Sequence, residues 1–203
     1  MVYKVDQVSS ASNQVAHYAE LETALNNVEG WLGLDDAIFL YEEAIRARGP
    51  IIEIGAFRGR STIALALGGR KSGSLVYSID PHTDFEGIFG GHFGPMDREA
   101  YYRNILNAGV AENAALVNLP STQVANSWRI EIALLFIDGD HRYEAVRQDM
   151  LSWSIFLRRG GLIVFDDANQ IGSGPNKVYE EVISSGLYSQ VCAAGKLRAA
   201  IKI

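Results

Sequence analysis

Acidic side chains recur where apolar segments of this chain end or turn. They are Glu53, Asp80, Asp138, Asp166 and Asp167. Negative charges that are brought together cost free energy unless cations or hydrogen-bond donors face them. These positions therefore predict a site that binds polar or cationic groups.

Three of these carboxylates suit a hard divalent cation. Asp138 and the pair Asp166 and Asp167 offer oxygen ligands from two strand ends, which Mg²⁺ accepts while it keeps positions for water and substrate. His141 follows Asp138 by three residues and could act as a general base beside the ion. The alternative is that Asp167 caps a turn, Asp138 bonds to the backbone and His141 is structural. Asp140 is the expected cap of the helix that follows.

A second group of residues surrounds Gly55 and Gly59. Here an apolar strand runs into a glycine-spaced turn and then into a helix that begins with hydroxyl residues. Glycines let a backbone approach a ligand, and the free amides of the helix start face the same place. The turn predicts a socket for a nucleoside-bearing cofactor, although the GxGxxG fingerprint is absent and an ordinary strand-to-helix turn is the alternative. Asp80 could accept hydrogen bonds from both ribose hydroxyls, or simply form a turn before Pro81.

Composition bounds the class of protein. The 203 residues are 48% hydrophobic, so we expect a single domain over 1–203 with 1–30 as an N-terminal helical extension. A net charge of -6 disfavours a nucleic-acid partner. We read no signal peptide or membrane span, and a lone cysteine, Cys192, fits a reducing compartment. The expected location is the cytoplasm, with no membrane partner.

Helix and strand signals alternate along the chain. Expected helices cover 18–30, 35–49, 61–67, 99–106 and 146–157. Expected strands cover 51–54, 74–79, 114–119, 132–137 and 162–165, and the tail 188–203 indicates two strands around Gly195 and Lys196. Asp35 is the expected cap of the second helix, and Gly160 with Gly161 the expected end of the fifth.

This alternation predicts an α/β fold with a doubly wound, Rossmann-like sheet. The sheet should be mainly parallel with a C-terminal antiparallel strand, and helices should cover both faces. Ligands bind beyond the carboxyl ends of such strands, so the loops that follow them should converge on one cleft. The long loop 82–98, with glycines between aromatic residues, is expected to be a lid or a packed Ω-loop.

These segments together resemble the class I S-adenosylmethionine-dependent methyltransferases. The similarity is to small-molecule and sugar O-methyltransferases related to macrocin O-methyltransferase and, more distantly, to catechol O-methyltransferase. It covers the chain from Gly30 to Asn169 in six ordered segments: GWLGLDDAIFLYEEA, IIEIGAFRGRSTIALA, VYSIDPH, LPSTQVANSW, LLFIDGDHRYEAV and GGLIVFDDAN. The resemblance implies a Rossmann-like methyltransferase sheet, S-adenosylmethionine as cofactor and, in metal-using relatives, Mg²⁺ or another hard divalent cation.

The resemblance also implies roles for individual positions. The cofactor-binding positions would be Glu53, Gly55, Ala56, Gly59, Ser61, Asp80, Ser121, Thr122 and Asp138. Ser61 would hold the methionine carboxylate, Asp80 the ribose, and Ser121 with Thr122 the adenine edge. The metal ligands would be Asp138, Asp166 and Asp167, and the catalytic residues His141 and Asp138. The Asp-Asp pair stands where catechol enzymes have Asp-Asn, which makes the site more negative.

We therefore expect a metal-dependent O-methyltransferase that acts on a hydroxyl of a small molecule such as a sugar, phenol or natural product. A nicotinamide-dependent oxidoreductase or epimerase is a rival, disfavoured by the missing GxGxxG and Tyr-x-x-x-Lys patterns. A non-catalytic module that binds S-adenosylmethionine is another, but it would not need Asp138 or His141. A homodimer through the N-terminal helices would cover their apolar faces.

Overall fold

A seven-stranded sheet forms the centre of the computed structural model, which describes residues 10–88 and 90–203. The strand order is β5-β2-β1-β6-β7-β9-β8. The strands are β1 (Ile51–Ile54), β2 (Val76–Ile79), β5 (Ala114–Val117), β6 (Ile132–Ile137), β7 (Leu157–Phe165), β8 (Tyr188–Val191) and β9 (Arg198–Lys202). The first five pair in parallel, whereas β9 pairs antiparallel with both β7 and β8. The expected doubly wound sheet with a C-terminal antiparallel strand is confirmed.

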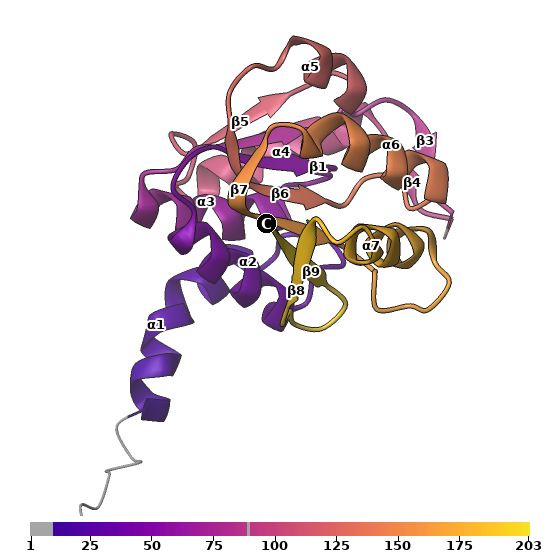
Figure 1. Cartoon of the computed structure of the whole chain (residues 1–203). Helices are drawn as coiled ribbons and strands as arrows, with labels where there is room; N and C mark the ends of the chain where they lie inside the picture. The colour runs from indigo at the N-terminus through magenta and orange to yellow at the C-terminus, as the bar shows by residue number, and fades with distance from the viewer. Residues whose placement is uncertain (1–9, 89) are drawn as a thin grey trace, which may run out of the picture.

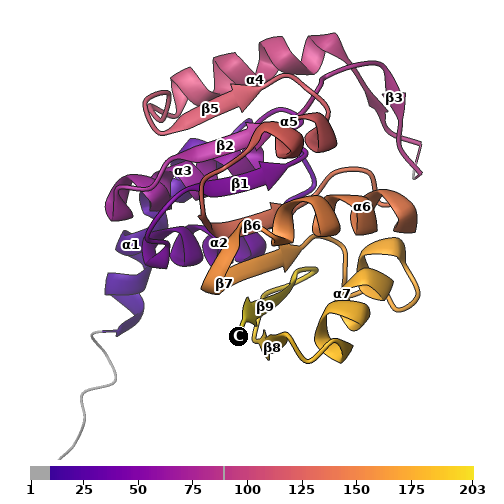
Figure 2. The ribbon, with the colours of Figure 1, turned by 45° about the horizontal axis from the view of Figure 1, so that its top comes forward.

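Helices cover both faces of this sheet (Figures 1 and 2). They are α1 (Ser10–Leu25), α2 (Leu34–Arg46), α3 (Arg60–Ser72), α4 (Pro95–Asn107), α5 (Ser121–Ser127), α6 (Tyr143–Ser154) and α7 (Gly174–Ser184). One buried apolar cluster joins the sheet to α1, α2, α3 and α4, and a second joins it to α5, α6 and α7. Neighbouring side chains of β1 divide between the two clusters, Ile51 in the first and Ile52 in the second. This alternation is the pleat of a strand that is buried on both faces.

The central strands bring the expected site residues to one edge of the sheet. Ile54 at the end of β1 pairs with Ile79 of β2 and with Ile137 of β6. In Figure 2 the arrowheads of β1, β6 and β7 point toward the same edge. Gly55, Asp80 and Asp138, which follow these three strand ends, are therefore neighbours, although they are far apart in sequence.

The N-terminal helix is tied to the sheet layer through Arg60. Its guanidinium donates hydrogen bonds to the carbonyl oxygens of Leu25, Val28 and Leu32, at 2.9, 2.7 and 2.9 Å. Helix α1 ends at Leu25, earlier than the expected end near Gly30, and its start projects from the rest of the fold (Figure 1). Of the expected extension, residues 1–9 lie outside the described residues. Among the described helices, none has the combined length and apolarity needed to span a membrane.

Two predicted helix caps are wrong. Gly33 is the N-cap of α2, and Asp35 lies inside the first turn, where a carboxylate still interacts favourably with the helix dipole. Arg142 is the N-cap of α6, and Asp140 instead accepts the backbone amide of Arg142 at 3.1 Å. Both helices therefore begin without a side-chain cap.

The predicted helix 146–157 is also wrong at its C-terminal end. Helix α6 ends at Ser154, and Leu157 already pairs with Ile132 at the start of β7. Strand β7 then continues through Gly160 and Gly161, which we had expected to end a helix. The apolar spacing up to Leu157 fits a helix, but pairing with the neighbouring strand β6 decides the conformation. Tertiary pairing here overrides local periodicity.

The loop 82–98 contains more regular structure than expected. It forms a two-stranded hairpin, β3 (Phe85–Glu86) with β4 (His92–Phe93), and its last residues begin α4 at Pro95. The sequence analysis did not predict the short helix α5 or the helix α7. The hairpin stands beyond the carboxyl edge of the sheet (Figure 2).

Candidate active site

Asp80 organises the turn after β1. Its Oδ2 accepts the backbone amides of Ala56 and Phe57, both at 2.9 Å, and its Oδ1 accepts the amide of His82 at 2.8 Å. A carboxylate offers about four lone-pair sites, so Asp80 keeps capacity for further donors. The predicted ribose-binding residue is thus also the residue that holds the glycine turn against β2.

Gly55 and Gly59 were predicted to let the backbone approach a ligand. The structure shows a different reason why glycine is needed at these two positions. Gly55 has φ 86°, and a Cβ there would lie 2.1 Å from the carbonyl oxygen of Asp138. Gly59 also has φ 86°, and a Cβ there would lie 3.1 Å from the ring of Tyr101. Each glycine is therefore required by a left-handed backbone and by packing inside the protein. The first contact brings the Gly55 turn directly against the end of β6.

Glu53 lies fully buried beneath this turn. It accepts hydrogen bonds from the hydroxyls of Ser61 and Thr62 at 2.5 Å and of Ser78 at 2.6 Å. Burial raises the pKa of Glu53 to about 7, although the three hydroxyl bonds oppose the shift. Glu53 therefore supports the turn from the protein side, and the Ser61 side chain points to Glu53.

The start of α3 leaves backbone amides for a ligand. Its N-cap, Gly59, provides no side-chain hydrogen bond to them. The first amides of a helix have no partner within the helix and attract negative charge. Ser61 could therefore hold a carboxylate through its amide, while its hydroxyl stays with Glu53.

Ser121 and Thr122 lie at the start of α5, beyond β5. The Ser121 hydroxyl accepts a hydrogen bond from the Trp153 indole at 2.8 Å. Burial raises the pKa of the neighbouring Asp149 to about 6, opposed by a hydrogen bond from Ser121. The Ser121 side chain therefore joins α5 to α6. The adenine role of both residues stays a prediction.

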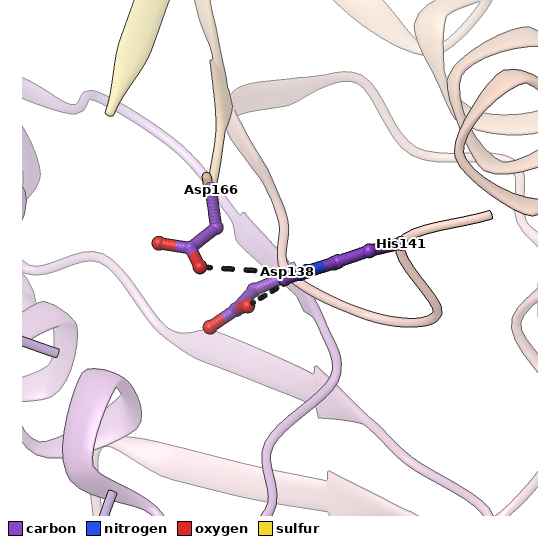
Figure 3. A group of neighbouring side chains, drawn as sticks. All are labelled: Asp138, His141 and Asp166. Atoms are coloured by element: carbon purple, nitrogen blue, oxygen red, sulfur yellow. Dashed lines mark hydrogen bonds and ion pairs between the residues drawn. The ribbon is translucent and has the colours of Figure 1, made fainter. Parts of the chain in front are cut away.

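Asp138, His141 and Asp166 form a compact cluster at the carboxyl edge of the sheet (Figure 3). His141 Nε2 lies 3.4 Å from Asp138 Oδ1 and 3.9 Å from Asp166 Oδ2. One ligand atom from each residue lies within 4.8 Å of the others. Asp138 follows β6 and Asp166 follows β7, so the pairing of these strands builds the cluster. The ends of β6 and β7 therefore meet here, as expected of neighbouring parallel strands.

Asp167 flanks this cluster rather than completing it. Its Oδ2 lies 3.4 Å from His141 Nδ1, and its Oδ1 lies 3.3 Å from the ammonium of Lys196. Lys196 Nζ also donates to Asp166 Oδ2 at 2.7 Å. We predicted Asp167 as the third metal ligand and His141 as a base. In the structure, His141 completes the three-residue group with Asp138 and Asp166, and Asp167 lies beside it.

The charges of the cluster shift the pKa values of its members. Burial raises the pKa of Asp166, and Asp138 raises it further, whereas Lys196 lowers it. Burial works against the charged forms of His141 and Lys196, but the surrounding carboxylates outweigh it and raise the pKa of both. Lys196 therefore remains an ammonium ion, and His141 binds a proton more readily than a free imidazole does.

A groove of about 340 Å³ opens beside His141 and Asp167. Ile88 of the β3–β4 connection and Ile171 of the loop before α7 form exposed apolar parts of its wall. Gln170 and Ser173 add polar groups, so the wall of the groove has both apolar and polar parts. A small molecule in this groove would contact His141 and Asp167.

Two features of this region were not predicted from the sequence. Lys196 appeared only as a turn residue, because nothing in its local sequence connects it to Asp166. Trp31 is 67% exposed, and its ring centroid lies 5.2 Å from that of Phe57 in the glycine turn. Phe57 contacts Phe93 of the hairpin at 5.3 Å. Only the fold brings these aromatic side chains together.

Comparisons with known proteins assign the family. A family profile described as "Methyltransferase domain" matches residues 52–168, more than half of the chain. The chain therefore belongs to the methyltransferase-domain family. Among curated proteins, it is 30% identical over 156 residues to the uncharacterised protein R132 of Acanthamoeba polyphaga mimivirus. The match covers 68% of this chain and 62% of that relative.

Solved structures share this fold. Cofactor-bound Rv0187 from MTB is 21% identical with a TM-score of 0.67, covering 97% of this chain and 92% of that one. The O-methyltransferase from Bacillus cereus in complex with SAH is 20% identical with a TM-score of 0.65, covering 95% and 97%. The resemblance to class I methyltransferases is thus confirmed for family and fold.

Proposed function

We propose that this protein is an S-adenosylmethionine-dependent O-methyltransferase that methylates a hydroxyl group of a small molecule with the help of a divalent cation. One observation carries the proposal: the Gly55 turn packs directly against Asp138. A methyl donor held at the turn and a hydroxyl held at the acidic cluster would be neighbours. Positioning of this kind supplies much of the acceleration of a two-substrate reaction.

S-adenosylmethionine would supply a methyl group that its sulfonium already activates. Asp80 is placed to accept a ribose hydroxyl, since the three amides that it binds leave about one of its four lone-pair sites. The amides at the start of α3, including that of Ser61, suit the methionine carboxylate. Ser121 and Thr122 remain the proposed adenine contacts.

The acidic cluster fits a hard divalent cation such as Mg²⁺. Asp166 is 1% exposed, and its Oδ1 has no hydrogen-bond partner among the described residues. Carboxylate oxygens of Asp138 and Asp166, with Asp167 as a further donor, form a set of hard ligands for such an ion. When bound, such an ion lowers the pKa of a nearby hydroxyl.

His141 is the proposed general base. Its ring borders the groove, where an acceptor hydroxyl could reach it. Asp167 beside Nδ1 would fix the ring orientation and stabilise the imidazolium formed when His141 takes the proton. The deprotonated oxygen would then attack the methyl carbon, and S-adenosylhomocysteine would leave.

The groove beside His141 favours a small molecule as acceptor. Its volume of about 340 Å³ lies at the lower end of the range for small-molecule sites. Sugars, phenols and natural products with a free hydroxyl are the proposed acceptors.

We further propose that the chain acts in the cytoplasm, without nucleic-acid or membrane partners, as a homodimer through its N-terminal helices.

A methyl-transfer screen tests this function. Purified protein is incubated with S-adenosylmethionine, Mg²⁺ and a panel of hydroxyl acceptors, and mass spectrometry detects a gain of one methyl group. Asp138→Ala should abolish transfer while calorimetry shows normal binding of S-adenosylhomocysteine. Binding without transfer to any acceptor would favour the non-catalytic module, and a change in nicotinamide absorbance would favour the oxidoreductase. Full activity of Asp138→Ala with a chelator present would contradict the metal-dependent step.

A further inference from the structure

Lys196 is held in place at the acidic cluster and is not a loose surface side chain. It lies in the turn between β8 and β9, where Gly195 has φ 49°. A Cβ at Gly195 would lie 2.2 Å from Asp36 Oδ1, so this turn packs tightly against α2. Asp36 Oδ1 accepts the backbone amide of Lys196 at 3.1 Å, and the Lys196 carbonyl accepts the amide of Asn169 at 3.3 Å. Both backbone groups of Lys196 are therefore fixed.

The ammonium of Lys196 contacts the carboxylate oxygen of Asp166 that faces His141. Lys196 Nζ lies 2.7 Å from Asp166 Oδ2, which is also the atom 3.9 Å from His141 Nε2. A divalent ion lies roughly 2.0–2.6 Å from its carboxylate ligands. An ion on Asp166 Oδ2 would therefore lie close to the ammonium, and two like charges would repel each other.

We propose that Lys196 is a resident cation of the cluster, which weakens divalent-ion binding and gives up Asp166 Oδ2 when an ion enters. This inference rests on the proposed function, because it concerns the same cation site. Lys196 contacts only one oxygen each of Asp166 and Asp167, and Asp166 Oδ1 is buried without a hydrogen-bond partner among the described residues. The cluster thus stays assembled without an ion and keeps capacity for one.

Titration of the full-length protein with Mn²⁺, followed by electron paramagnetic resonance, tests this inference. Lys196→Met removes the charge and keeps most of the side-chain length, so it should bind Mn²⁺ at least about tenfold more tightly than the wild type. Lys196→Arg keeps the charge and should retain the weak affinity. Lys177→Met removes an exposed charge of α7 and should leave the affinity unchanged. Adding Asp138→Asn to Lys196→Met should abolish the gain.

Equal Mn²⁺ affinity of the wild type and Lys196→Met would overturn the inference, as would the absence of Mn²⁺ binding in every variant. Lys196→Met could fold poorly, because its carboxylates lose their counter-charge. Its thermal midpoint should then rise with Mn²⁺ far more than that of the wild type, and equal responses would also refute the idea. Calorimetry with S-adenosylhomocysteine and the acceptor screen, both on the wild type, report separately on the proposed function.

Discussion

Gly55 and Asp138 are in backbone contact across the carboxyl ends of β1 and β6. A Cβ at Gly55 would lie 2.1 Å from the Asp138 carbonyl oxygen, and the amide of Asp138 donates to the carbonyl of Ile54 at 2.8 Å. The turn proposed to hold the methyl donor and the first carboxylate of the cation cluster therefore form one rigid unit. A shift of either would disturb the other.

Gly55→Ala should destabilise the protein and abolish binding of S-adenosylhomocysteine. The matched control is Gly73→Ala, because Gly73 has a similar left-handed φ of 76° but nothing within 4 Å of its Cβ position. The control should lose only about 1 kcal/mol, the cost of the backbone conformation. Thermal unfolding and calorimetry measure both variants. If the two lose the same stability, the contact with Asp138 is not tight.

The sequence correctly predicted that the Gly55 turn and Asp138 lie close together, because their closeness follows from the order of the parallel strands. Asp80, Asp138 and Asp166 each follow an apolar strand, and such strand ends meet at one edge. The sequence could not predict the contribution of Lys196. Strand β9 returns antiparallel beside β7, and only that pairing, with Phe165 opposite Arg198, carries the preceding turn to Asp166.

Leu157 was also misread from its local pattern, because it continues a helical spacing but pairs with Ile132 in the sheet. The hydroxyl of Ser61 bonds to the buried Glu53, which the local sequence does not show, and its role at the cofactor carboxylate stays a prediction. A partner that is distant in sequence decides each case, and a local pattern does not reveal it.

Asp80→Asn should weaken binding of S-adenosylhomocysteine by roughly 10- to 100-fold. An amide has one acceptor oxygen with two lone pairs, so it cannot serve the amides of Ala56, Phe57 and His82 and also accept a ribose hydroxyl. Calorimetry measures the affinity, and circular dichroism checks the fold. Glu86→Gln, an exposed change on the hairpin, is the control and should bind normally. Unchanged affinity of Asp80→Asn would remove Asp80 from the proposed cofactor site.

Glu53 should make the protein less stable as the pH rises. Its pKa is raised from 4.5 to about 7 in the folded state, chiefly by burial, so the folded protein binds the proton more tightly than the unfolded chain does. The free-energy cost of ionising the buried Glu53 is absent below about pH 4.5 and grows between pH 4.5 and 7. Above pH 7 it is complete and lowers the free energy of unfolding by roughly 3 kcal/mol.

Urea unfolding of the wild type and of Glu53→Gln at pH 5, 6, 7 and 8 measures this effect. Glutamine carries no charge, so the variant should lose less stability than the wild type as the pH rises. Asp149, with a pKa raised to about 6 by burial, adds a smaller slope of the same sign in both proteins. Parallel pH curves for the two proteins would show that Glu53 titrates normally in the fold.

Arg60→Met should release the N-terminal helix and lower the free energy of unfolding by about 2–4 kcal/mol. The substitution removes three charge-assisted hydrogen bonds and leaves the carbonyls of Leu25, Val28 and Leu32 without this donor. Arg103→Met, which breaks only an exposed helical ion pair with Glu99, is the control and should cost about 0.5 kcal/mol or less. Hydrogen exchange should locate the added flexibility of Arg60→Met in α1. If exchange in α1 is unchanged, apolar packing of Leu21 and Leu25 holds the helix without Arg60.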